Sequence, residues 1–258
     1  MQAPAAPVQV EVEEQGTLLR LTLARPRGNV IDRAMVACLT ETIALASAQP
    51  ELRTILLAGE GPHFSFGASV EEHRPGEVEA MLPELHELVR ALLGCGRVVL
   101  AAVRGQCLGG GLELALCAHR IFAAPDSALG QPEVKLAVFA PAATVLLPAR
   151  IGAAAADDLL LTGRSIGAEE AAAIGLVQEV VDDPLEAARG WHRTHLAPLS
   201  AAGLRHAVLA GRDALLRRVA DELPRLEERY LTELMATCDA REGIAAFLER
   251  RAPRWSNT

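Results

Sequence analysis

The chain has 258 residues, of which 50% are hydrophobic and 3% aromatic, with a formal net charge of -8 at pH 7. This hydrophobic content is ample for a sizeable buried core. An acidic chain with few aromatic rings lacks the basic surface and stacking groups of a nucleic-acid-binding protein. Its apolar runs, such as residues 98–103, are too short to span a bilayer, and residues 1–7 carry no basic signal-peptide segment. We therefore expect a soluble cytoplasmic protein that binds neither nucleic acid nor membrane.

Candidate metal ligands and disulfides are few. The five cysteines are scattered and include no Cys-x-x-Cys pair: Cys38, Cys95, Cys107, Cys117 and Cys238. Such a set is typical of reduced thiols, mostly in the core. His192 and His195 lie in a polar segment with no third ligand, so we expect no metal site.

Strands and helices alternate along the first part of the chain. Residues 8–13 and 18–23 have the period-two pattern of strands, and Gln15-Gly16 between them indicates a hairpin turn. Asp32 is a good N-cap for the helix that follows. The later elements are expected at 32–47 (helix), 54–58 (strand), 77–93 (helix), 98–103 (strand), 112 onward (helix) and 120–124 (strand). Repeated strand-then-helix units predict an α/β layered domain.

The composition shifts toward the C-terminus. The chain becomes Ala-rich and helical from about Gly152, with one further strand at 176–181. After Pro198 only helices are expected, at about 214–237 and 239–250. We therefore divide the chain into a core of residues 1–197 and a helical segment of residues 198–258.

Three glycines precede a carboxylate at Cys107-Leu108-Gly109-Gly110-Gly111-Leu112-Glu113. Glycines let another group approach the backbone, and the first amides of a helix are free donors at its positive end. Together they suit a developing oxyanion, with Glu113 facing the same pocket. A tight strand-to-helix turn with a solvated Glu113 is the alternative.

Two further segments offer related chemistry. Residues 64–70 form a loop of small residues whose amides could supply a second donor, although the segment alone is also typical of an ordinary loop. In Gly130-Gln131-Pro132-Glu133, the proline stiffens the chain before a carboxylate with apolar neighbours. A partly buried glutamate has a raised pKa and becomes a usable proton donor. The alternative is a surface glutamate after a turn.

Taken together, these motifs resemble the crotonase (enoyl-CoA hydratase/isomerase) family. The oxyanion loop, the Gly-Gly-Gly-x-Glu helix start and the Gly-Gln-Pro-Glu turn occur in the family's order and spacing, and further matches extend along nearly the whole chain. The resemblance implies a spiral of repeated ββα units with a C-terminal helical trimerisation segment. It also implies trimers, often paired into hexamers, and a coenzyme A thioester substrate.

The resemblance also implies a set of site residues. The amides of Ala68 and Gly110 would hold the thioester oxygen, and Glu113 and Glu133 would be the catalytic acid/base pair. Members that hydrate a double bond carry both glutamates, so Glu113 would take the proton of a water and Glu133 would handle the proton at the α-carbon. The acyl-CoA would contact Arg27, Phe66, Ala68, Gly109, Phe139 and Pro141. No metal and no cofactor beyond the substrate's coenzyme A is expected.

Departures from the family pattern point to a subgroup. Residues 139–145 lack the glycines that many hydratases have after the second glutamate, and Ser69 replaces a usual Asp. These stretches resemble the cyclohexa-1,5-diene-1-carbonyl-CoA hydratases of anaerobic benzoyl-CoA degradation. Three alternatives remain open: a generic enoyl-CoA hydratase/isomerase of fatty-acid-type oxidation, a related isomerase, hydrolase or decarboxylase, and a non-catalytic RNA-binding homologue.

Overall fold

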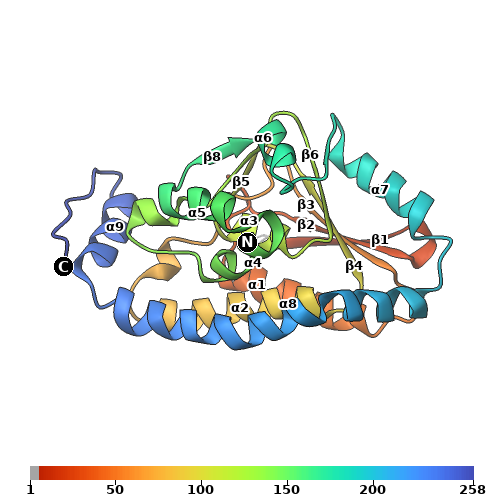
Figure 1. Cartoon of the computed structure of the whole chain (residues 1–258), viewed down its shortest axis with the longest axis horizontal. Helices are drawn as coiled ribbons and strands as arrows, with labels where there is room; N and C mark the ends of the chain where they lie inside the picture. Colours follow the sequence, from red (N-terminus) through yellow and green to blue (C-terminus); the bar gives the residue numbers. More distant parts are fainter. Residues whose placement is uncertain (1–5) are drawn as a thin grey trace, which may run out of the picture.

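The computed structural model describes residues 6–258, so most of the Ala/Pro-rich tail considered in the sequence lies outside the described residues. Strands and helices alternate, which confirms the predicted α/β class (Figure 1). The strands are β1 (Val8–Glu13), β2 (Leu18–Leu23), β3 (Thr54–Gly59), β4 (Val98–Val103), β5 (Gln106–Leu108), β6 (Arg120–Ala123), β7 (Ala128–Gly130), β8 (Ser165–Gly167) and β9 (Glu179–Val180). The helices are α1 (Arg33–Ser47), α2 (Val78–Gly94), α3 (Gly110–Leu116), α4 (Pro141–Ile151), α5 (Ala153–Thr162), α6 (Ala168–Ala173), α7 (Pro184–His195), α8 (Ala201–Arg229) and α9 (Cys238–Leu248).

A six-stranded sheet forms the centre of the molecule, in the order β1-β2-β3-β4-β6-β9. Its first pair is antiparallel, with Val8 opposite Leu23, and the other neighbours are parallel. The turn between β1 and β2 places Gln15 at φ 56° and Gly16 at φ 89°. The hairpin predicted at Gln15-Gly16 is therefore confirmed.

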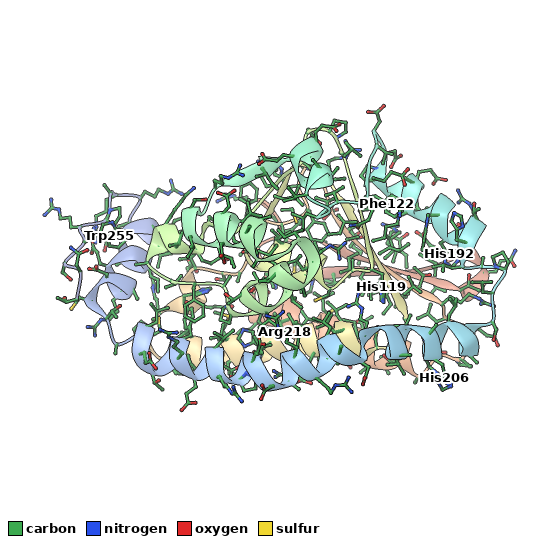
Figure 2. The ribbon with its side chains drawn as sticks, viewed as in Figure 1. His119, Phe122, His192, His206, Arg218 and Trp255 are labelled. Carbon is green, nitrogen blue, oxygen red and sulfur yellow. The ribbon has the colours of Figure 1, made fainter. Side chains whose placement is uncertain are left out.

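Both faces of this sheet are buried, which explains why its parallel strands are continuous apolar runs rather than alternating ones. On one face, Leu56, Leu100 and Phe122 share a buried cluster with Ala188 of α7. Figure 2 shows Phe122 next to that helix. On the other face, Val99 and Ile121 belong to the main core, which also contains the buried sides of α1 and α2. A fully buried leucine contributes about 1.5–3 kcal/mol of hydrophobic stabilisation, so these layers hold the sheet in place.

A smaller three-stranded sheet, in the order β5-β7-β8, positions the loops that carry the sequence motifs. Strand β5 follows β4 through a short turn at Gly105, whose φ is +54° and whose Cβ would collide with the Pro62 carbonyl. Strands β5 and β7 are parallel, and Gly109 N donates to Gly130 O at 3.0 Å just beyond them. The chain therefore leaves this sheet with the glycine segment and the Gly-Gln-Pro-Glu turn side by side.

Helix α8 runs along the long axis of the molecule and packs against α2 and α4 (Figure 1). It begins at Ala201, where Ser200 Oγ accepts from Gly203 N, so the predicted start at residue 214 was wrong. The early turns are held by tertiary contacts, since Leu204 and Val208 pack onto the core under the sheet. The boundary near residue 197 falls between α7 and α8, and the two-part division itself stays a prediction.

No helix in residues 6–258 combines the length and the apolar character needed to cross a membrane. Three of the five cysteines, Cys95, Cys107 and Cys117, are buried, in line with the prediction that most lie in the core.

Candidate active site

A cavity of about 280 Å³ lies where the three motifs meet. Its walls come from the 66–70 loop, α2, the start of α3, the 132–141 segment and the C-terminal helices. Most of its lining is apolar, and its polar groups are two carboxylates, a histidine, a lysine, a tyrosine and backbone amides. The residues that line it include Phe66, Ala68, His73, Gly109, Gly110, Glu113, Glu133, Phe139, Pro141 and Tyr230.

Two backbone amides converge on this cavity. A Cβ built on Gly110 would lie 3.1 Å from Ala68 N, so the two backbones are in close contact. Ile31 N donates to Gly67 O and Ser69 N donates to Ile31 O, both at 2.9 Å. The N–H of Ala68, between these two residues, is therefore directed away from Ile31. The Gly110 N–H belongs to the first turn of α3 and has no helical acceptor. No hydrogen bond among the described residues uses either amide hydrogen, so both are available to one oxygen.

Glu113 is buried on α3 with its side chain only 3% exposed. Its Oε1 accepts from Ala143 N at 2.8 Å, in the first turn of α4. Burial raises the pKa of Glu113, and the charge of His86 and the amides of Ala143 and Ala142 oppose that rise. The α4 amides therefore stabilise the ionised form of Glu113.

Glu133 lies against the glycine turn, because a Cβ on Gly109 would meet its Oε1. Burial, followed by the negative charge of Glu113, raises the pKa of Glu133 to about 8. The Gln131 amide lies 2.9 Å from Oε2, where its nitrogen can donate to the carboxylate. At neutral pH Glu133 therefore carries a proton that it could donate, while the amide of Ala143 favours the ionised form of Glu113.

A buried pair lies close enough to act on Glu113, since the charge of His86 lowers the pKa of that carboxyl. His86 on α2 is fully buried, and its Nδ1 lies 2.7 Å from Glu227 Oε2 on α8. The sequence motifs did not point to either residue, because the pairing joins two helices distant in the chain.

His73 contributes a neutral ring to the lining. Its Nδ1 lies 2.8 Å from Ser69 O and therefore carries the hydrogen, and burial lowers the pKa of His73. Its Nε2 is then an acceptor. Tyr230 also lines the cavity and was not predicted from the sequence. The one feature that could have pointed to it is that it is the single tyrosine of the chain.

The expected substrate-binding residues fall into two groups. Ala68, Gly109, Phe139 and Pro141 line the cavity, and Phe66 lines it with its side chain 46% exposed. Arg27 does not line it: it is exposed and precedes Gly28, against which the Phe66 ring packs. Arg27 thus lies outside the cavity, next in sequence to the glycine that contacts the Phe66 ring.

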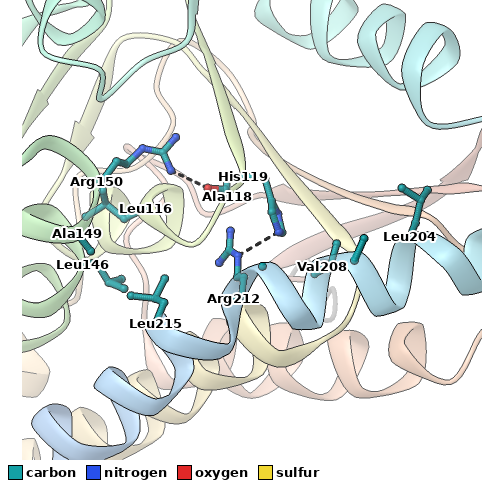
Figure 3. A pocket seen from close by; sticks show the side chains of 12 residues that line it. Leu116, Ala118, His119, Leu146, Ala149, Arg150, Leu204, Val208, Arg212 and Leu215 are labelled. Carbon is teal, nitrogen blue, oxygen red and sulfur yellow. Dashed lines mark hydrogen bonds between the residues drawn. The ribbon is translucent and has the colours of Figure 1, made fainter.

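A second cavity, of about 500 Å³, lies between α4 and α8 (Figure 3). Arg212 Nε lies 3.0 Å from His119 Nε2, and Arg150 donates to Ala118 O at 2.8 Å. Burial, followed by the charge of Arg212, lowers the pKa of His119 to about 3. Its lining includes no carboxylate, so this cavity has no acid/base pair.

Of the two histidines considered as metal ligands, His192 has a structural role and His195 is exposed. His192 Nδ1 lies 2.8 Å from Thr54 Oγ1 and its Nε2 lies 3.0 Å from Thr17 Oγ1, so both ring nitrogens are engaged under the sheet (Figure 2). Within residues 6–258, no three His, Cys, Asp or Glu side chains converge as a metal-binding group.

A fold of this kind, with two free amides facing two buried carboxyl groups, defines a class of enzymes that stabilise an oxyanion and move protons. The enoyl-CoA hydratase/isomerase family model matches residues 13–258, and the chain belongs to this family. The family resemblance and the crotonase-type fold predicted from the motifs are confirmed.

Individual relatives sharpen the comparison. The chain is 50% identical over 257 residues, covering 100% of both proteins, to cyclohexa-1,5-dienecarbonyl-CoA hydratase of Thauera aromatica. It is 32% identical over 261 residues to carnitinyl-CoA dehydratase of Salmonella arizonae, covering 95% of this chain and 97% of that protein. The crystal structure of an enoyl-CoA hydratase from Mycobacterium avium superposes with a TM-score of 0.85 at 30% identity, covering 97% of this chain and 99% of that one.

Proposed function

We propose that the chain hydrates cyclohexa-1,5-diene-1-carbonyl-CoA to 6-hydroxycyclohex-1-ene-1-carbonyl-CoA in anaerobic benzoyl-CoA degradation. The observation that carries this proposal is the pair Glu113 and Glu133 facing the free amides of Ala68 and Gly110 in one apolar cavity. The 50% identity to the Thauera hydratase along the whole chain supports the choice of substrate.

The amides act on the thioester carbonyl. When its oxygen accepts hydrogen bonds from Ala68 N and Gly110 N, electron density leaves the β-carbon, which becomes open to attack by water. Glu113, whose carboxylate form is favoured by the α4 amide of Ala143, takes a proton from that water. The enolate that forms keeps its charge on the oxygen between the two amides.

The position of the second proton follows from the product. Water adds to the β-carbon, because only this ring carbon is made electrophilic by the carbonyl. The enolate then extends over the second double bond, and a proton at its far end leaves one double bond beside the new hydroxyl, as in the product. The α-carbon protonation expected from the sequence applies to a linear enoyl thioester; for the ring, the proton goes to the far end of the diene. Glu133, protonated near neutral pH, is the available acid.

The cavity walls suit a flat ring. Phe139 and Pro141 supply apolar surface beyond Glu133, and Phe66 lies at the exposed side where the coenzyme A chain would enter. Arg27, outside the cavity, is then a candidate for a phosphate contact. Shape discrimination of this kind is worth about 1–3 kcal/mol per methylene-sized mismatch, so a preference of ~10²-fold over crotonyl-CoA is expected rather than exclusion.

No metal or further cofactor enters this proposal, because the amides already supply the electrophilic contact. We also propose that the protein works in the cytoplasm as a trimer or hexamer assembled through residues 198–258. Sedimentation of the purified chain tests the assembly.

The main alternative is a generic enoyl-CoA hydratase, which the likeness to the Mycobacterium avium enzyme favours. An RNA-binding homologue has no use for a paired Glu113 and Glu133, and salt-dependent RNA binding would reveal it. The deciding experiment is turnover of crotonyl-, cyclohexenoyl- and cyclohexadienoyl-CoA by the same preparation. A kcat/KM for crotonyl-CoA equal to or above that for the cyclic diene would favour the generic enzyme.

A further inference from the structure

Tyr230 has a buried hydroxyl with no hydrogen-bond partner among the described residues, and it lines the cavity that contains Glu113 and Glu133. Its side chain is 1% exposed, and its Oη makes no hydrogen bond to any described residue. Five other buried side-chain atoms within residues 6–258, all nitrogens, also have no hydrogen-bond partner, but none belongs to a residue that lines the cavity. Burying an unpaired hydroxyl is costly, so this one calls for a partner that the folded chain does not supply.

The backbone is irregular at this residue. Residues Tyr230–Leu234 form a π-helical turn directly after α8, and Met235 N donates to Tyr230 O at 3.0 Å. Such turns are rare and occur frequently at functional sites. Here the turn ends the long helix and leaves Tyr230 as its buried residue, while Arg229 before it is exposed.

Two aromatic neighbours hold the ring. The Phe139 ring lies 5.3 Å from it in an edge-to-face arrangement, and the His73 ring lies 6.5 Å away. All three residues line the cavity. Burial, followed by the charges of Glu133 and Glu113, raises the pKa of Tyr230, so the hydroxyl keeps its proton and is a donor throughout the working range.

We propose that Tyr230 is a specificity-determining residue whose hydroxyl donates a hydrogen bond to the oxygen that hydration adds to the acyl group, an inference that rests on the proposed function. The acyl group itself is hydrocarbon apart from its thioester, so the only polar atom it gains in the reaction is this oxygen. Tyr230 lines the same cavity as both carboxylates, and Glu113 takes a proton from the water that supplies the oxygen. A binding site whose hydroxyl donates to a ligand oxygen discriminates strongly against a ligand without that oxygen.

A double-mutant cycle between protein and ligand tests this inference. Binding of 6-hydroxycyclohex-1-ene-1-carbonyl-CoA and of cyclohex-1-ene-1-carbonyl-CoA, which lacks the hydroxyl, is measured by calorimetry for the native protein and for Tyr230→Phe. The Kd of the deoxy ligand divided by the Kd of the hydroxy ligand is expected to be at least tenfold larger in the native protein than in the variant. An unchanged ratio overturns the proposal, even if both affinities fall, because equal losses indicate a packing role.

Two controls separate the possible outcomes. Tyr230→Phe keeps the ring and removes an unpaired buried hydroxyl, so its Tm should equal or exceed that of the native protein. Phe139→Leu changes the packing of the same wall without removing a donor, so it should shift both ligands by a similar factor.

The same cycle with 3-hydroxybutanoyl-CoA and butanoyl-CoA separates this inference from the substrate assignment. Coupling in the linear pair alone would keep the role of Tyr230 and reject the cyclic substrate, and coupling in neither pair rejects the role itself. Because Tyr230 is the single tyrosine, labelling with 3-fluorotyrosine adds a readout from one ¹⁹F resonance. Its shift should respond to the hydroxy ligand more than to the deoxy ligand.

Discussion

The carboxylate of Glu133 occupies the space that a side chain on Gly109 would need: a Cβ built on Gly109 lies 2.5 Å from Glu133 Oε1. Gly109 also has φ 51° and ψ -128°, a conformation that only glycine adopts readily. The first glycine of the motif thus sets where the acid stands relative to α3.

Gly109→Ala should therefore impair both stability and catalysis. The strained backbone costs about 1–3 kcal/mol, and displacing Glu133 by a fraction of an ångström to an ångström lowers kcat by up to ~10²-fold. Chemical denaturation and steady-state kinetics measure the two effects. Gly211→Ala is the matched control: a Cβ there meets nothing within 4 Å, so activity should persist and helix stability should hold or rise. Normal kcat in Gly109→Ala would show that the contact with Glu133 is dispensable.

Removing either carboxylate should slow hydration. Glu113→Gln and Glu133→Gln are each expected to lower kcat at least ~10²-fold, the scale for losing a general acid or base. Because both act in the same addition of water, the double variant should lose less than the product of the single losses. Glu169→Gln, at an exposed position on α6, should keep full activity. A single variant that folds and retains near-native kcat would remove that residue from the mechanism.

The pH dependence should show the raised pKa of Glu133. As an acid with a pKa of about 8, Glu133 loses its proton above that pH, so kcat/KM for hydration should decline there. The stability of the fold should change with pH in the same direction as kcat/KM. Between the unfolded pKa of 4.5 and the folded pKa of about 8, the folded state binds more protons than the unfolded state. Its free energy of unfolding therefore falls as pH rises through this range. Glu133→Gln should lose this dependence in urea titrations at several pH values, and an unchanged pH slope would assign the dependence to other groups.

Phe139 should affect the choice of acyl group. Phe139→Leu changes the bulk of the wall beside Glu133, and the ratio of kcat/KM for cyclohexadienoyl-CoA to that for crotonyl-CoA should change by about tenfold or more. Binding of coenzyme A itself should change less. Leu45→Ala, on the exposed face of α1, is expected to leave the ratio as it is. If Phe139→Leu changed kcat/KM equally for both thioesters, this wall would not discriminate between acyl groups by shape.

Chelation should leave activity intact. In the proposed mechanism the Ala68 and Gly110 amides polarise the thioester carbonyl, so dialysis against EDTA is expected to leave kcat unchanged. Loss of turnover that returns on adding a divalent cation would contradict the proposed chemistry.

Much of the site could be read from local sequence. Glycines and proline restrict the backbone over a few residues, so the segments around Gly109, Gly110 and Pro132 indicated free amides and a fixed Glu133 before any long-range contact was known. The β1–β2 hairpin and the capped helix after Asp32 are equally local. Their order along the chain was sufficient to identify the family.

Only the tertiary structure showed how distant segments complete the site. Ala143 reaches Glu113 from α4, and Tyr230 enters the cavity from the end of α8; nothing within a few residues of either one specifies this. The early start of α8 was also missed, because its first turns are stabilised by packing on the sheet rather than by helical propensity. Amides and turns follow from the residues beside them, whereas the environment that raises the pKa of Glu133 and buries the Tyr230 hydroxyl exists only once segments distant in the chain have packed together.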